Sequence, residues 1–166
     1  MAELTTNINY LQPTGFKVVI DRKKFGNLEF FAQSIEHPSV SIPTAEVPFR
    51  RANIHMAGDK LTFGQLSANI ILDENMLAYT EMYDWVKRLV EENNTTKYDA
   101  RFSGTPTTSI DISVIVLSSN NTEVKTIRYI DCVPIDIGSV NFQATTQDVT
   151  YLTFPVSFMF SYFEVV

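Results

Sequence analysis

The stretch RRANIHMAGDKLTF at residues 50–63 concentrates the side-chain types that could do chemistry. Arg50 and Arg51 could grip a phosphate or a carboxylate, because guanidinium groups bind such anions through paired hydrogen bonds. His55 and Asp59 could act together as a general base and its orienting group. These four side chains would meet only if the segment folded back on itself, so an active site here requires a compact loop.

The spacing within the same stretch favours an extended ribbon over a compact loop. Arg51, Asn53 and His55 alternate with apolar residues, which is the period of a β-strand. The tripeptide Ala57-Gly58-Asp59 then has the composition of a turn. An extended arm with alternating polar and apolar side chains is suited to lying across a partner surface. We therefore interpret residues 47–60 as an interaction loop.

The remainder of the sequence has no recognisable arrangement for catalysis or metal binding. His37 and His55 are separated by a proline-rich segment, and the sequence has no HExxH pattern. Cys132 is the only cysteine, so the chain can form neither an internal disulfide nor a cysteine-rich metal site. The six glycines are dispersed and cannot build a phosphate-binding loop. We predict that the protein is not an enzyme and binds no cofactor or metal ion.

The charge of the chain argues against a surface that binds nucleic acid. The formal net charge is −6, and the densest basic run, residues 22–24, is explained by a turn between two strands. Only 19% of the residues are charged, which is below the roughly 25% that is typical of globular proteins. Because 12% of the residues are aromatic, we expect partners to cover much of the surface.

The length of 166 residues predicts a single domain, residues 1–166, with a substantial core. Residues 1–14 are polar and are expected to form an N-terminal arm. They lack the basic start and apolar stretch of a signal peptide, and the longest apolar runs are too short to span a bilayer. We expect no membrane segment, synthesis in the cytoplasm, and a chain that stays soluble until it assembles.

The first part of the chain is predicted to contain a hairpin and a proline-rich region. Residues 16–22 and 28–36 alternate like strands, and the turn signal at 23–27 predicts that they pair with each other. Three prolines between residues 38 and 48 allow only edge strand or extended loop, because proline cannot donate a ladder hydrogen bond.

A strand and a helix are predicted next. Residues 61–72 alternate like a strand and end in a buried-looking apolar run. Residues 74–93 place apolar side chains at helical spacing and charged ones on the other face, and Asp73 is suited to cap the N-terminus. We predict an amphipathic helix that covers one face or opening of a sheet.

The chain after residue 108 is predicted to be β-structure to its end. Residues 109–117, 124–137 and 149–166 each carry a stripe of apolar side chains with a period of two. In the second of these strands, the predicted apolar face carries Ile127, Tyr129, Val133, Ile135 and Ile137. In the last, it carries Leu152, Phe154, Val156, Phe158, Phe160 and Tyr162.

The last predicted strand suggests a contact between subunits. A long aromatic strand with a single charge is an aggregation hazard at an open sheet edge. Pro155, however, argues against full pairing on both sides. A strand from another subunit that completes the sheet, with Pro155 at an unpaired position, would satisfy both facts. The candidate inter-subunit residues are Phe154, Pro155, Phe158 and Phe160.

The same β-rich part is poor in basic residues. Between residues 106 and 166 only Lys125 and Arg128 are basic, and the polar residues are mostly Ser, Thr, Asn and Gln with scattered acids. Such a face could line a water-filled channel through which an anion passes without sticking. An ordinary solvated β face explains the composition equally well. The candidate channel-side acids are Asp111, Asp131, Asp136 and Asp148.

The interaction loop and the helix together resemble a known family. The sequence VPFRRANIHMAGDKLTF is followed by a short strand and by a helix that contains MYDWVKRL. The matching positions are Arg51, Ile54, Ala57, Gly58, Asp59, Phe63, Tyr83, Asp84 and Trp85. In this pattern the chain resembles the tail tube proteins of T4-like contractile-tailed bacteriophages. The sharp part of the resemblance covers residues 47–89, while the length and the aromatic final strand extend it to nearly the whole chain.

The resemblance implies a fold and an assembly. The expected fold is mainly β with one α-helix, a rolled antiparallel β-sandwich or small β-barrel whose inner strands complete a hexameric ring barrel. Rings of six copies stack into the tail tube, with the tail sheath protein outside it and baseplate and tail terminator proteins at its ends. DNA passes through the lumen without specific binding. The protein is then a structural component of the virion, assembled in the host cytoplasm.

The resemblance also assigns the interaction loop to contacts within or between rings. The residues expected to make these contacts are Phe49, Arg50, Arg51, Asn53, Ile54, His55, Met56, Gly58, Asp59 and Lys60. Two alternatives share the fold: a tube protein of a type VI secretion or pyocin system, and a baseplate or tail-terminator relative. A third, from another class, is a barrel that binds a small apolar ligand between helix and sheet.

Overall fold

The apolar stripes of the sequence become antiparallel strands in the computed structural model, which describes residues 10–20, 32–92, 109–144 and 151–166. The strands before the helix are β1 (Phe16–Val19), β2 (Ala32–Glu36), β3 (Val40–Ser41), β4 (Thr44–Phe49), β5 (Ala52–Ala57), β6 (Thr62–Phe63) and β7 (Leu66–Ile71). The helix is α2 (Leu77–Glu92). It is followed by β8 (Ile110–Leu117), β9 (Glu123–Ile137), β10 (Thr153–Met159) and β11 (Tyr162–Val165).

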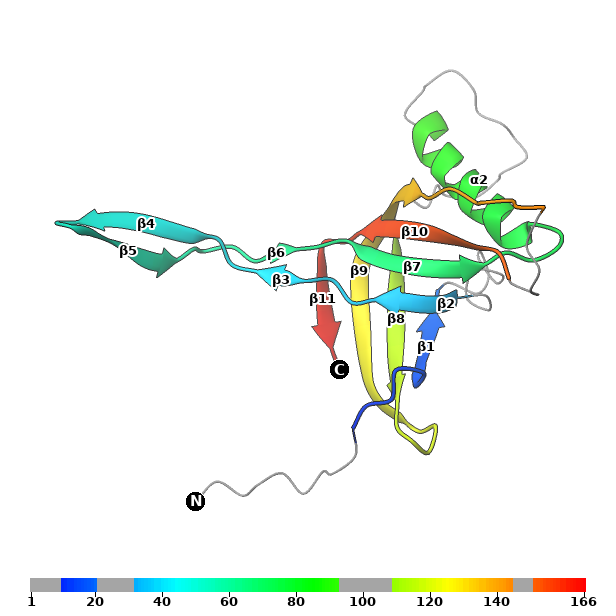
Figure 1. The fold of residues 1–166 in the computed structure, drawn as a ribbon, viewed down its shortest axis with the longest axis horizontal. Helices are drawn as coiled ribbons and strands as arrows, with labels where there is room; N and C mark the ends of the chain where they lie inside the picture. Colours follow the sequence, from blue (N-terminus) through cyan, green and yellow to red (C-terminus); the bar gives the residue numbers. More distant parts are fainter. Residues whose placement is uncertain (1–9, 21–31, 93–108, 145–150) are drawn as a thin grey trace.

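A single rolled sheet forms the body of the protein, in the order β1-β8-β9-β10-β7-β2 with β11 also paired to β9. The long strand β9 belongs to both halves of this sheet: its first part pairs with β8 and β11, and its last part pairs with β10. We name β1, β8, β11 and the first part of β9 the lower sheet, as they lie in Figure 1, and β2, β7, β10 and the last part of β9 the upper sheet. The predicted fold class, mainly β with one helix and antiparallel sheets, is confirmed for the described residues.

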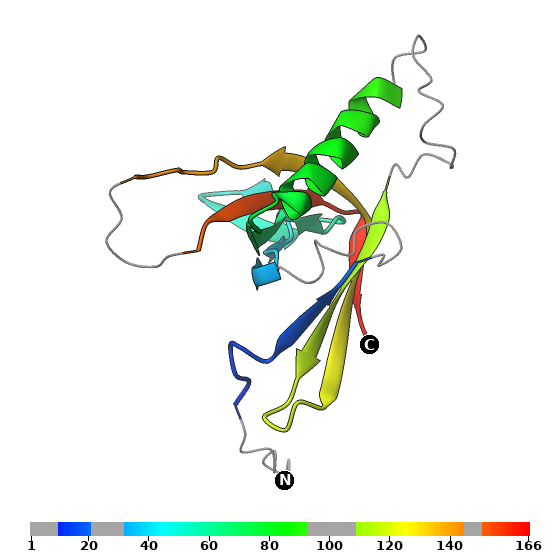
Figure 2. The ribbon, with the colours of Figure 1, turned by 90° about the vertical axis from the view of Figure 1, so that its right-hand side faces the viewer.

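The core lies between the two halves of the sheet and under the helix, which lies over the upper sheet (Figure 2). Ala78, Met82 and Trp85 follow one another at helical spacing and are buried. The Trp85 ring lies 5.9 Å from the ring of Phe158, between ring centroids. Because apolar residues from both sheets and the helix meet in one cluster, the core is continuous.

The helix begins later in the chain than predicted. It starts at Leu77 because residues 73–76 form a turn, in which the amide of Met76 donates to the carbonyl oxygen of Asp73 over 3.0 Å. Asp73 still caps the helix, since its carboxylate accepts a hydrogen bond from the amide of Ala78 at 3.3 Å. Among the described residues, no helix combines the length and apolarity needed to cross a membrane.

The predicted hairpin between residues 16–22 and 28–36 is wrong. β1 pairs with β8, and β2 pairs with β7, so the two strands lie at opposite ends of the strand order. Their alternation was a correct signal for strands, but it carries no information about partners. The predicted turn at 23–27 lies outside the described residues.

The predicted apolar face of β9 is correct up to Tyr129 and again at Ile137, which packs against the core after a second register shift opposite Ser157 and Phe158. Asp131 adopts a left-handed backbone conformation, with φ of 56°, and the ladder with β8 shifts register opposite it. Such a bulge inserts an extra residue and exchanges the two faces of the strand beyond it. As a result Cys132 and Pro134 are buried, whereas Ile135 is exposed.

The predicted final strand is divided into β10 and β11. Phe154, Phe158 and Phe160 are buried in the core as the stripe predicted. The break after β10 changes the face of the residues that follow, so that Phe163 packs against the core and Tyr162 is exposed.

Candidate assembly interface

A two-stranded arm projects from the body of the protein. It consists of β4 and β5, residues 44–57, and Figure 1 shows it extending away from the rolled sheet on the narrower ribbon of β3 and β6. Every residue of β4 and β5 is exposed. A two-stranded hairpin is at best marginally stable alone in water, and no other described element covers this one.

The register of the arm separates its side chains into an apolar face and a polar face. Directly opposed residues of antiparallel strands point to the same side. The pairs on one side are Ala45 with Met56, Val47 with Ile54, and Phe49 with Ala52. The pairs on the other side are Thr44 with Ala57, Glu46 with His55, and Pro48 with Asn53.

The two faces differ in whether their side chains have interaction partners within the arm. On the polar face, the Asn53 amide donates to the carboxylate of Glu46 at 3.1 Å, and His55 Nδ1 lies 3.8 Å from the same carboxylate. On the apolar face, Val47, Phe49, Ile54 and Met56 are 43 to 58% exposed. A contiguous exposed apolar surface of this kind is typical of a protein interaction site.

The tip of the arm carries Arg50 and Arg51. Arg50 has a φ of 54°, a conformation that favours glycine in a tight hairpin turn. Its guanidinium lies 5.9 Å from the centroid of the Phe49 ring, which extends the apolar face to the tip. A bulky cation held at a position that suits glycine indicates a role for its side chain.

The base of the arm explains the glycine of the Ala57-Gly58-Asp59 turn. The amide of Gly58 donates to the carbonyl oxygen of Pro43 at 2.8 Å, and a Cβ atom at Gly58 would collide with that oxygen. Only glycine therefore allows the two chains to meet here. Asp59 and Lys60 follow this contact and are exposed.

Five aromatic side chains pack against one another where the ribbon of β3 and β6 joins the body. We name them the arm-root cluster: His37, Phe63, Tyr129, Phe160 and Phe163. The His37 Nδ1 atom lies 2.6 Å from the Tyr129 hydroxyl, and the His37 ring stands edge-on to Phe163 with 5.0 Å between centroids. Phe63 packs against Phe160 and Phe163 at 5.6 and 5.5 Å. Aromatic pairs at these separations attract one another beyond the burial of their area.

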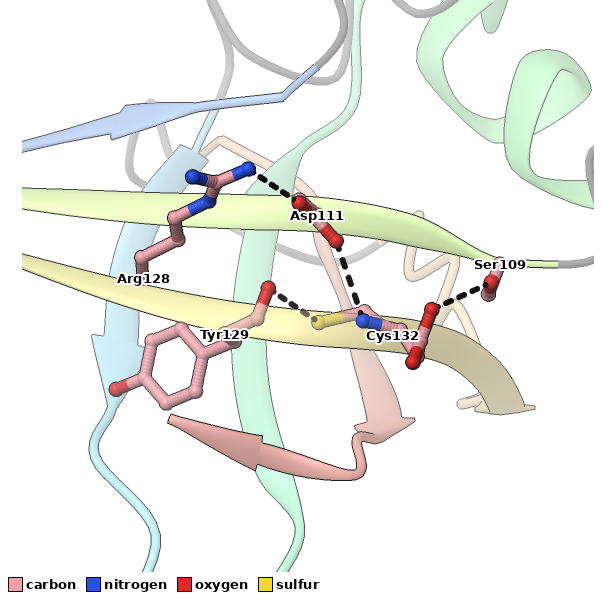
Figure 3. Close-up of polar contacts among 6 residues, drawn as sticks. Ser109, Asp111, Arg128, Tyr129 and Cys132 are labelled. Carbon is pink, nitrogen blue, oxygen red and sulfur yellow. Dashed lines mark hydrogen bonds and ion pairs between the residues drawn. The ribbon is translucent and has the colours of Figure 1, made fainter. Parts of the chain in front are cut away.

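Two of the predicted channel-side acids lie together where β8 meets β9. Asp111 pairs with Arg128 at 2.7 Å and also accepts a hydrogen bond from the backbone amide of Asp131 (Figure 3). The carboxylate of Asp131 accepts hydrogen bonds from the hydroxyls of Ser109 and Ser161. This network holds the bulge of β9. Asp111 is therefore partly neutralised by its arginine.

The other predicted acids do not join this network. Asp136 is exposed on the last part of β9, opposite Ser157 of β10, in the upper sheet. Asp148 lies outside the described residues. The structure thus brings two of the four acids together and places a third on the other half of the sheet.

The expectation of an inter-subunit strand at residues 154–160 is corrected by the pairing of β10. This strand is bonded to β7 on one side and to β9 on the other, within the same chain. Pro155 is opposite Asn69 of β7, and its carbonyl oxygen accepts a hydrogen bond from the amide of Gly138 at 2.7 Å. The aromatic stripe is thus protected inside the chain, and β10 offers no free edge to another subunit.

Free strand edges lie elsewhere: β2 pairs only with β7 among the described residues, and the lower sheet has a free edge at each end. Among the described residues, β1 pairs only with β8, and β11 pairs only with β9. Sequence reasoning missed β11, because the break after β10 is not signalled by glycine or proline. For residues 38–48 the sequence allowed edge strand or extended loop, and β4 is such a strand; the alternation of Ala45, Val47 and Phe49 with polar residues and a proline could have indicated its two faces.

Three further features of the described residues concern reactivity and ligand binding. Burial raises the pKa of the Cys132 thiol to about 12, so the thiolate needed for nucleophilic attack does not form at ordinary pH. No group of His, Cys, Asp and Glu within them could hold a metal ion. An apolar pocket between β1, β2 and β7 has a volume of about 10 Å³, about one water molecule. None of its lining residues belongs to the helix, whereas the third alternative places its ligand between helix and sheet.

A family model identifies one family, and comparisons with solved structures identify one fold. A model of the phage tail tube protein family matches residues 3–166. The chain is similar to a chain in the PVC sheath–tube complex of an extracellular contractile injection system, with a TM-score of 0.65, 15% identity and coverage of 99% of both chains. A search of curated proteins gives no match.

Two further solved structures share the fold. A chain of the tube-terminating cap of the anti-feeding prophage gives a TM-score of 0.68 at 14% identity, covering 99% of this chain and 96% of that one. A chain of the anti-feeding prophage baseplate gives 0.63 at 12% identity, covering 100% and 97%. At such identities these likenesses establish the fold alone.

Proposed function

The chain belongs to the phage tail tube protein family, and from this premise we propose that it is the repeating subunit of the inner tube of a contractile phage tail. In this proposal six copies form a ring, and rings stack into a tube inside the sheath, between the baseplate and the tail terminator. The tube belongs to the virion, is assembled in the host cytoplasm, and conducts the genome into the next host. The role is structural, so no bond is made or broken.

The observation that carries this proposal is the pair of free edges on the lower sheet. The strands β1, β8, β9 and β11 alternate in direction along this sheet. Because their number is even, β1 of a second copy placed beside β11 would run antiparallel to it and continue the same ladder. Repetition of this contact around a ring removes every edge of the lower sheet.

The arm supports contacts between neighbouring copies. Its apolar face offers surface for burial, and its tip is cationic while the remainder of the chain is acidic. The formal net charge of −6 includes +2 from Arg50 and Arg51, so all other residues together carry −8. Opposite potentials favour association and fix its register. A second copy of this chain is therefore a suitable partner for the arm.

The outer face of the lower sheet would line the lumen. Lys17 and Arg128 lie on this face, together with the acids Asp111, Asp131 and Glu164. Two bases against three acids leave one negative charge per subunit. The repulsion of DNA phosphates is then weaker than a row of unpaired acids would produce, and free passage depends on the absence of a basic stripe.

A second candidate function is a tube-end component or the tube of a related injection system. The similar solved structures include a tube-terminating cap and a baseplate as well as a sheath–tube complex. These roles share a fold and differ in growth: a tube subunit adds to itself repeatedly, whereas an end component stops after one ring.

Electron microscopy of the purified chain tests the proposal. We expect stacked rings whose length grows with protein concentration. In a matched variant, Pro43 is joined to Gly58 through two glycines, which removes the arm and keeps its base. This variant should form rings that do not stack. Single rings from the intact chain would favour an end component, and monomers at every concentration would overturn the proposal.

A further inference from the structure

The arm-root cluster joins the two surfaces that the proposed assembly uses. His37 and Phe63 stand where the chain leaves the body for the arm and where it returns, next to β3 and within β6. Phe163 belongs to β11, the free edge of the lower sheet. The rings of His37 and Phe63 both lie within 5.5 Å of the Phe163 ring, between centroids. A single side chain of the edge strand thus supports both strands of the arm root.

The inner part of the cluster, Tyr129 and Phe160, is buried, and the Tyr129 hydroxyl has a hydrogen-bond partner. Tyr129 is 1% exposed, and its ring lies 5.2 Å from that of Phe160. Burial raises the pKa of Tyr129 to about 12, with a smaller contribution from nearby Cys132, so the hydroxyl keeps its proton at ordinary pH. It therefore remains able to share a hydrogen bond with His37. This part of the cluster is a fixed anchor.

The outer part of the cluster is Phe163, whose position depends on whether β11 stays paired. β11 has only four residues, Tyr162–Val165, and is bonded to β9 alone among the described strands. Short strands with one bonded edge open at low free-energy cost. Hydrogen bonds from a neighbouring copy along the second edge would hold β11, and with it Phe163, in place.

We infer that Phe163 couples the pairing of the β11 edge to the order of the arm, so that closure of a ring prepares its arms for stacking onto the next ring. This inference rests on the proposed function, because it needs both a ring contact at β11 and a stacking contact at the arm. The physical basis is preorganisation: an arm whose root is already fixed loses less conformational freedom when it docks. Rings should then stack more readily than free subunits add.

The variant Phe163→Leu tests this coupling, because it keeps an apolar side chain and every backbone hydrogen bond of β11 while it removes the aromatic contacts. Sedimentation separates monomers, rings and tubes. We expect the ratio of tubes to rings to fall about tenfold, and the ratio of rings to monomers to stay within about threefold of the parent. Phe142→Leu, at a residue that is 67% exposed, is the matched control and should assemble like the parent.

Hydrogen exchange at the arm root provides a second readout. The amide of Gly64 donates to the carbonyl oxygen of Ser39 at 2.9 Å, which closes the ribbon below the arm. In the parent chain this amide should exchange about tenfold more slowly in rings than in monomers. In Phe163→Leu, the two rates should be alike.

A third variant keeps the test decisive if Phe163→Leu does not fold. Tyr129→Phe retains the ring and removes only the hydrogen bond to His37, so it should lower the tube-to-ring ratio about threefold. Stacking of either folded variant at the parent level would overturn the coupling. Equal loss of rings and tubes would also overturn it, since β11 would then serve pairing alone. If the parent itself forms neither rings nor tubes, the proposed function fails as well.

Discussion

The arm and the lower sheet share one sequence pattern but differ in whether their apolar side chains are buried. Both are antiparallel, and both alternate apolar with polar side chains. In the lower sheet the apolar residues, such as Ile112 and Val114, are buried against the core. In the arm the equivalent residues, such as Phe49 and Ile54, remain about half exposed. Alternation thus defines two faces of a ribbon, and only the surrounding fold decides whether the apolar face is covered within the chain.

The difference has a consequence for stability. A covered apolar face contributes to the free energy of folding of the chain that contains it. An uncovered face contributes nothing to the free subunit and is available to the free energy of association. Substitutions in the two regions should therefore affect different measurements, and this separation can be tested with side chains of the same type.

The largest expected effect comes from truncating one core phenylalanine, Phe158 of the upper sheet, and one phenylalanine of the arm, Phe49. Phe158 is 2% exposed and Phe49 is 58% exposed. We expect Phe158→Ala to lower the free energy of unfolding by about 3–5 kcal/mol, and Phe49→Ala to change it by less than about 0.5 kcal/mol. Urea denaturation of the monomers measures both. Phe49→Ala should instead reduce tube formation, and a large loss of stability from it would show that the arm packs within the chain.

Alkaline pH should weaken the body and leave the arm unaffected. Burial raises the pKa of Cys132 from its ordinary 9.0 to about 12, and that of Tyr129 from 10.0 to about 12. Because the folded-state pKa values lie above the unfolded ones, the stability from the neutral forms is complete below pH 9 and is lost as pH rises toward 12. The arm has neither residue type.

Unfolding measured between pH 8 and pH 12 provides the check on this effect. Cys132→Ala and Tyr129→Phe should each flatten the decline of stability with pH, whatever their effect at neutral pH. Parent and variant curves that run parallel throughout this range would show that the two groups do not control it.

The next effect concerns the base of the arm. A methyl group at residue 58 would collide with the carbonyl oxygen of Pro43, so Gly58→Ala should force the two strands apart and tilt the arm. We expect tube formation to fall about tenfold, with little change in the unfolding of the body. Leu61→Ala, at an exposed position just beyond the predicted contact residues, is the matched control. Normal tubes from Gly58→Ala would mean that the direction of the arm is unimportant.

The smallest effect is expected from the charges at the tip. Reversal of both Arg50 and Arg51 to glutamate should weaken tube formation about threefold at low salt, and less at high salt, because exposed charges are screened. Arg50→Gly separates charge from conformation, since glycine relieves the positive φ while it removes one cation. Unchanged polymerisation of the double variant, with the monomer fold intact, would remove the tip from the interface.

The sequence by itself determined the local features of this protein. The apolar stripe that includes Phe154 and Phe158 predicted a buried strand, the spacing around Trp85 predicted a helix that covers the sheet, and Ala57-Gly58-Asp59 indicated the interaction loop and its family. These features depend on the period of the backbone and on neighbouring residues, so a short window of sequence contains them.

Only the tertiary structure decided which elements meet. It separated β1 from β2, reversed the faces of β9 at Asp131, placed β10 inside the chain and β11 at its edge, and left one face of the arm uncovered. Strand pairing depends on which apolar faces of the whole chain can be buried against one another. Residues far apart in sequence therefore determine which strands pair. A local pattern records which side of a strand is apolar, whereas the partner of that side is a property of the whole fold.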